Sequence, residues 1–167
     1  MRKSAIRGLP PIIFCLVLAS CKTYDIFVND TVLYTPRPLF TNYTMVDPAL
    51  QDCVKSAIDR YKVSEATQLQ ILSCSDMGIN TLTGLAVFTG LRQLNLSDNA
   101  LSDISELSSL GALSEVDLGN NHIVDALPLA ELQALDMVDL TNNQTLRCPK
   151  RQALLRVVAL HLPSHCN

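Results

Sequence analysis

The sequence lacks the short motifs that mark the commonest catalytic sites. Serine, histidine and aspartate all occur, but no serine lies in a G-x-S-x-G nucleophile motif. No glycine-rich phosphate-binding loop occurs in the 167 residues. We therefore expect no enzymatic activity, no bound cofactor and no small-molecule substrate.

Long apolar runs are also missing. The run from Ile12 to Ala19 falls well short of the ~20 residues that a transmembrane helix needs. It follows the basic residues Arg2, Lys3 and Arg7 and precedes small residues, which is the layout of a secretory signal peptide. A transmembrane helix and a buried first helix of a cytosolic fold are the alternatives. We expect residues 1–20 to be a signal peptide.

The end of this run carries a more specific feature, "LASC", from Leu18 to Cys21. This tetrapeptide resembles the lipobox of bacterial lipoproteins. The resemblance implies cleavage after Ser20 and attachment of lipid, such as palmitate, to Cys21 as the mature N-terminus. Lys22 stands where an aspartate would favour retention in the inner membrane, so the resemblance favours the outer membrane. We expect an exported protein, anchored by lipid in the bacterial cell envelope.

Basic residues are few. The chain has 13 Lys and Arg against 16 Asp and Glu, a net charge of −3. Three of the basic residues lie in the predicted signal peptide, so 10 remain against 16 acidic residues, a net charge of −6. Binding of nucleic acid requires a basic surface. This composition therefore argues against nucleic acid and permits attraction to a basic partner.

Apolar residues recur with a period of 22 over residues 69–146. Each unit starts with a leucine and has an apolar residue or cysteine three and five positions later. The starting residues are Leu69, Leu91, Leu113 and Leu135. Eight positions after the start, the first unit has Met77 and the others have Asn99, Asn121 and Asn143.

This pattern resembles the L-x-x-L-x-L-x-x-N-x-L of leucine-rich repeats, and its period is similar to that of the bacterial internalin type. The resemblance implies an α/β solenoid, a short right-handed coil with a parallel sheet on its concave face. The L-x-L step has the period of a strand, so alternate side chains enter the core. Stacking is required because no unit can bury its leucines alone.

The asparagines are expected to end the strands. Each amide can donate to and accept from backbone groups that the turn leaves unpaired inside the coil. Loss of one such pairing would cost roughly 1–3 kcal/mol. Met77 cannot form these bonds, so its unit is predicted to be the edge unit beside a cap.

A stack of repeats exposes an apolar cross-section at each end, so we expect a helical cap at both. In the first cap, residues 47–68, Asp47 suits the N-cap and Pro48 the first helical position. One helical face would then hold Leu50, Cys53, Val54, Ala57, Ile58 and Tyr61. The second cap, residues 147–167, contains a predicted helix from Pro149 with Leu154, Leu155, Val158 and Leu162 on its apolar side.

Residues 21–46 show no repeat and no helical period. We expect an extended tether between the lipid and the first cap, partly because Pro36 and Pro38 favour extended backbone. Apolar alternation at Phe27, Val32 and Tyr34 would alternatively add a strand to the cap.

Four cysteines remain after the signal peptide and Cys21 are set aside. An even number in an exported protein predicts two disulfides, although four cysteines allow three pairings. The predicted caps favour the pairs Cys53–Cys74 and Cys148–Cys166, because each would join a cap to its neighbour. A buried free thiol in place of a leucine is the alternative for Cys74.

The outward positions of the predicted strands define a candidate binding face. It is polar and acidic, without Lys or Arg, and Asp98, Glu115, Asp117 and Asp139 place acids on three adjacent units. Either these charges keep the face soluble or a basic protein surface docks there. His161, His165 and Cys166 could be considered as metal ligands, but their places at a helix end and beside a bridge predict surface residues and no metal site.

Two functions are consistent with these features. The first is a membrane-anchored protein–protein interaction module with a protein partner. The second is a structural envelope lipoprotein without a specific soluble partner.

Overall fold

The structure, a computed structural model, describes the chain except residues 1–25, 29–30, 36, 150–153, 155 and 167. The predicted signal peptide and Cys21 lie outside the described residues. The chain divides into two units, Met1–Pro36 and Arg37–Asn167. In the first unit, β1 (Ile26–Val28) and β2 (Thr31–Tyr34) pair with each other in antiparallel fashion. The predicted tether therefore includes a two-stranded hairpin.

The first cap contains α1 (Pro48–Tyr61). Asp47 is its N-cap and accepts hydrogen bonds from the N–H groups of Ala49 and Leu50 at 2.9 and 3.2 Å. The face predicted from the spacing is buried from Leu50 to Ile58. Tyr61 is an exception, with 52% exposure. It is the last helical residue, and the chain turns away at Lys62, whose φ is +53°.

The cap begins earlier than residue 47, which corrects the predicted boundary. Phe40 and Tyr43 stack on each other and pack edge-on against Phe88, with ring centroids 5.5–5.9 Å apart. Met45 is buried, and the Phe40 N–H donates to the Val63 carbonyl at 2.8 Å. These apolar side chains cover the end of the stack, so residues 37–46 belong to the cap.

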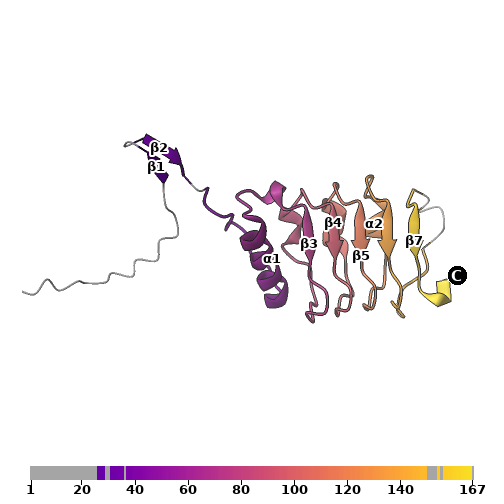
Figure 1. The fold of residues 1–167 in the computed structure, drawn as a ribbon. Helices are drawn as coiled ribbons and strands as arrows, with labels where there is room; N and C mark the ends of the chain where they lie inside the picture. Colours follow the sequence, from indigo (N-terminus) through magenta and orange to yellow (C-terminus); the bar gives the residue numbers. More distant parts are fainter. Residues whose placement is uncertain (1–25, 29–30, 36, 150–153, 155, 167) are drawn as a thin grey trace, which may run out of the picture. The chain divides into compact units, whose positions relative to one another are not determined.

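The repeats form one five-stranded parallel sheet with strands in chain order (Figure 1). Each strand pairs with the next in a register of 22 residues. The strands are β3 (Ile71–Ser73), β4 (Gln93–Asn95), β5 (Glu115–Asp117), β6 (Met137–Asp139) and β7 (Ala159–His161). The short-solenoid fold predicted from the repeat is thereby confirmed.

Short helical turns complete the units. They are η1 (Ala66–Gln68), η2 (Leu85–Val87), η3 (Ser105–Ser109), α2 (Leu127–Ala130) and η5 (Ser164–Cys166). The starting leucines Leu69, Leu91, Leu113 and Leu135 are at most 2% exposed. The apolar core is therefore a continuous column shared by neighbouring units.

The buried asparagines bind the turns together across units. The Asn121 amide nitrogen donates to the carbonyls of Leu96, Leu118 and Gly119 at 3.0–3.1 Å. Its amide oxygen accepts from the Leu101 N–H at 3.0 Å. Asn99 and Asn143 make the equivalent contacts one unit away.

The C-terminal capping helix was wrongly predicted. Where the helix was expected to continue, residues 159–161 form β7 and pair with β6. Val157, Leu160 and Leu162 lie 22 residues after Leu135, Val138 and Leu140 and repeat the V/L-x-x-L-x-L pattern. An added strand satisfies the open backbone groups of β6, which a helix would leave unpaired. Val158, placed on the apolar side of the helix, is instead 86% exposed.

Both predicted disulfides are present. Cys53–Cys74 joins α1 to the chain just after β3, and Cys148–Cys166 joins the two ends of the last turn. Cys74 is therefore bonded and is not a free thiol. The bonds tie the two ends of the stack to their neighbouring segments.

Asp47 offers a test of how the first cap is held. Its second carboxylate oxygen accepts from the Asn80 N–H at 2.8 Å, so the side chain joins α1 to the first repeat. Burial raises the pKa of Asp47, but the N–H groups of Asn80, Leu50, Ala49 and Thr81 outweigh burial and hold the pKa below its ordinary value.

We expect Asp47→Ala to lower the free energy of unfolding by about 1–2 kcal/mol at neutral pH. The lowered pKa means that this contribution is present above the ordinary Asp pKa of about 3.9 and is lost as the pH falls through the folded-state value. Urea unfolding should therefore show that the wild type and Asp47→Ala differ less in free energy of unfolding at about pH 3 than at neutral pH. Asp52→Ala, at an exposed position of the same helix, should have little effect; an equal loss there would contradict the cap assignment.

Candidate functional site

The outward side chains of the sheet form two rows on its concave face. The first row comprises Ile71, Gln93, Glu115, Met137 and Ala159. The second comprises Ser73, Asn95, Asp117, Asp139 and His161. All of these residues except Ala159 line a shallow depression of about 350 Å³. Neither of these described rows contains Lys or Arg.

Three of the four predicted acids come together in these rows. Asp117 and Asp139 are direct neighbours on β5 and β6. Glu115 precedes Asp117 by two residues on β5 and so lies on the same face. The Gln93 amide donates to the Glu115 carboxylate at 3.2 Å. These three carboxylates, which we call the acidic cluster, are the centre of the face.

Asp98 lies outside the acidic cluster, contrary to the predicted placement on a strand. β4 ends at Asn95, and Asp98 occupies the following turn with φ +59°. Asn120 and Asn142 occupy the same turn position with φ +54° and +59°. Asp and Asn tolerate this left-handed conformation better than other residues with side chains. The recurrence of Asp or Asn there is therefore explained by the backbone.

Two members of the cluster have a structural role that the sequence analysis missed. One oxygen of Asp117 accepts from the Gly119 N–H at 3.0 Å. The equivalent oxygen of Asp139 accepts from the Thr141 N–H at 2.8 Å. Asn95 does the same for Ser97 at 2.9 Å, so the recurring D/N-x-S/G/T was the available sequence signal. The turn bonds leave the second oxygen of each carboxylate directed to the face, where that of Asp139 lies near His161.

His161 extends the second row. Its place there was not predicted, because the sequence analysis assigned it to the end of a C-terminal helix instead of to β7. Its Nδ1 lies 3.6 Å from the second carboxylate oxygen of Asp139. The imidazole is 60% exposed and the Asp139 side chain 33%. It is the only group in the two rows that can carry a positive charge.

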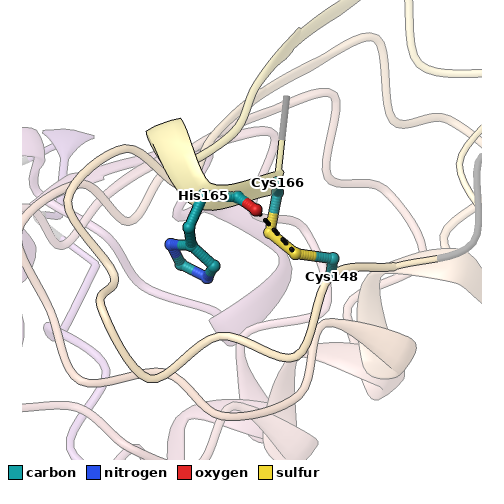
Figure 2. A group of neighbouring side chains, drawn as sticks. All are labelled: Cys148, His165 and Cys166. Carbon is teal, nitrogen blue, oxygen red and sulfur yellow. Dashed lines mark hydrogen bonds between the residues drawn. A yellow bond between two sulfur atoms is a disulfide. The ribbon is translucent and has the colours of Figure 1, made fainter.

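Another histidine, His165, lies at the C-terminal disulfide. Figure 2 shows His165 beside the bonded pair Cys148 and Cys166. One potential ligand atom from each residue falls within 4.8 Å of the others, but the disulfide removes both thiolates. The His165 Nε2 lies 2.9 Å from the Leu146 carbonyl. This histidine stands 22 residues after Asn143, at the asparagine position of the last unit.

Stacked 22-residue units, a parallel concave sheet and buried turn asparagines define a leucine-rich repeat protein, a fold that typically serves as a protein-interaction module. The chain belongs to the family described as "Endo-beta-N-acetylglucosaminidase EndoS LRR domain", which matches residues 45–153. The match is to the repeat domain of that enzyme. No curated protein matches the chain at a significant level.

The solved structure of an internalin supports the same fold. Internalin C2 from Listeria monocytogenes is 26% identical over 70% of this chain and 53% of its own, with a TM-score of 0.58. The internalin InlF from the same organism is 19% identical over 70% and 42%, with a TM-score of 0.48. The chain thus spans about half the length of the internalin C2 chain.

None of the helices in the described residues is long and apolar enough to cross a membrane.

The turn role of the acidic cluster can be separated from its charge. We expect the free energy of unfolding of the double variant Asp117→Asn, Asp139→Asn to lie within about 0.5 kcal/mol of the wild-type value. An amide oxygen can accept the same N–H bond, as that of Asn95 does. The double Ala variant should be about 1–3 kcal/mol less stable because the buried side of each turn loses its acceptor. Urea unfolding measures both; equal losses for Asn and Ala would contradict the turn role.

Proposed function

We propose that this protein is a lipid-anchored interaction module of the bacterial cell envelope that binds a basic protein partner on its concave face. The observation that carries the proposal is the acidic cluster of Glu115, Asp117 and Asp139 on a face whose two rows hold no Lys or Arg. The leucine-rich repeat fold supplies the precedent, since such solenoids use extended concave surfaces for binding.

Negative charge gives this face a preference for basic partners. Asp117 and Asp139 are register partners on strands about 4.8 Å apart, and like charges directly opposite destabilise a sheet. Only His161 can offset them within the rows. A basic partner would remove this repulsion and would associate faster at low ionic strength.

The size of the face limits its affinity. Five strands at a spacing of about 4.8 Å make a sheet only about 20 Å across. Interfaces of this size are at the small end of the stable range, and concentration at a membrane can compensate through avidity. We therefore propose modest intrinsic affinity that is strengthened by the anchor.

The anchor itself rests on the sequence "LASC". Cys21 and the preceding residues lie outside the described residues, so the support for lipidation is the resemblance to a lipobox. Two disulfides are consistent with export, because disulfides persist in oxidising compartments. On the same resemblance we propose the outer membrane.

We also propose that the protein is not an enzyme. The depression over the rows is shallow and open, and catalysis generally requires a site that excludes water. Two of its carboxylates each hold a turn N–H with one oxygen. No cofactor, nucleic acid or small-molecule substrate is assigned to this face.

A structural envelope lipoprotein is the second candidate. The turn bonds of Asp117 and Asp139 favour it, because they give both acids a reason to be present without any partner. Removing charge while keeping these bonds separates the two functions.

Neutralising the cluster should weaken partner binding. In the variant Glu115→Gln, Asp117→Asn, Asp139→Asn, we expect about tenfold weaker binding of a partner captured from the native envelope, and a flatter salt dependence. Affinity is measured by surface plasmon resonance at several salt concentrations.

The matched control is Asp103→Asn, Asp125→Asn, Glu131→Gln, which changes the net charge equally around a different surface depression. Asp103 and Asp125 also accept turn N–H bonds that Asn can keep. If both triple variants bind the partner with the same affinity, the acidic cluster is not the binding site and the structural function is favoured. Asp98→Asn should have a smaller effect than the cluster variant.

Changing Cys21 to Ser should release the protein from membranes or leave an unprocessed precursor, because no lipid can be attached. Membrane fractionation and mass spectrometry of the N-terminus measure this directly. An unchanged membrane fraction with normal processing would remove the lipoprotein assignment.

A further inference from the structure

An apolar groove lies between α1 and β3, at the N-terminal end of the sheet. Its lining includes Tyr61, Ile71 and Met77, which are 52%, 46% and 40% exposed. Its volume is about 210 Å³. Exposed apolar side chains gathered in one depression are more informative than the same residues scattered singly.

Two features of the first unit shape the groove, namely Met77 at the asparagine position and the Cys53–Cys74 disulfide. Met77 takes the position that a buried asparagine takes in the next three units, and it faces solvent. The Cys53–Cys74 disulfide fixes α1 against the end of β3. The Cys53 sulfur also lies 3.2 Å from the Ser73 carbonyl oxygen. Binding into this groove would therefore require little ordering of its walls.

The groove is continuous with the concave face. Ile71 and Ser73 line both the groove and the depression over the two rows. Ile71 begins the row that contains Glu115, and Ser73 begins the row that contains Asp117. A ligand that crosses the strands therefore meets an apolar end and then an acidic centre.

The charges on this face determine which end of such a ligand lies at the groove and which end lies at the acidic cluster. Arg60 lines the groove and is exposed, whereas the acidic cluster lies two and three strands away. Arg60 disfavours a cationic side chain at the groove, whereas the acidic cluster favours one at β5 and β6. An apolar side chain has the opposite preference.

We propose that the groove receives an apolar side chain from a basic protein segment that crosses the concave face. Its basic side chain would lie at Asp117 and Asp139. Two to three strand spacings of about 4.8 Å, or roughly 10–14 Å, separate the sites. In an extended segment, residues four positions apart point to the same side and lie ~13 Å apart at ~3.3 Å per residue. The inference rests on the proposed function and assigns it a partner motif, an apolar and a basic residue four positions apart.

Random 12-residue peptides displayed on phage, selected against the purified full chain, provide the probe. We expect enriched peptides to carry the apolar–basic spacing. Fluorescence anisotropy of one enriched peptide should then show about tenfold weaker binding to Ile71→Ser and to Met77→Gln, with the salt dependence unchanged. The double variant Asp117→Asn, Asp139→Asn should weaken binding and flatten the salt dependence.

Leu127→Ser is the matched control, because Leu127 is 61% exposed and belongs to α2, outside both rows. Thermal unfolding of every variant shows that the fold is kept. If the acid variant weakens binding and the groove variants do not, the groove assignment is overturned and the proposed function stands. If neither set weakens binding, or if no peptide is enriched, both are overturned.

Discussion

The turns of this solenoid direct backbone groups into the coil, and in the three units that start at Leu91, Leu113 and Leu135 a buried asparagine satisfies them. Asn121 binds three carbonyls and one N–H, all from its own unit and the unit before it, so a single side chain fixes both the turn and the stacking distance. A buried unpaired carbonyl or N–H would cost roughly 1–3 kcal/mol. The 22-residue period follows, because the same contacts must recur at the same height in each unit.

This constraint explains which parts of the fold could be predicted. Leucine spacing and the asparagines specify β3 to β6 directly, since they repeat without interruption. β7 was missed because Leu154, Val158 and Leu162 also fit a helix, and its unit has His165 where asparagine would mark the repeat. Local spacing alone does not choose between these structures, whereas the open edge of β6 favours the strand.

The site was predictable to a lesser degree. The alternation of L-x-L places Glu115, Asp117 and Asp139 outward, and the structure agrees. Asp98 could not be placed, because the point at which the strand ends depends on backbone conformation beyond the repeat itself. The groove at Met77 depends on the packing of α1 against β3, a contact between segments that no periodicity describes.

The first and last units of the stack share two features, a replaced asparagine and a disulfide. Each end unit lacks the asparagine, with Met77 in the first and His165 in the last, and each holds a disulfide, Cys53–Cys74 or Cys148–Cys166. Closing loops of this size contributes about 3 kcal/mol each in the chain-entropy model, comparable to the hydrogen bonding that an asparagine would supply. A disulfide is thus present in the two units whose asparagine position holds another residue. It also leaves the asparagine position free to carry another side chain, and at Met77 that side chain lines the groove next to the acidic face.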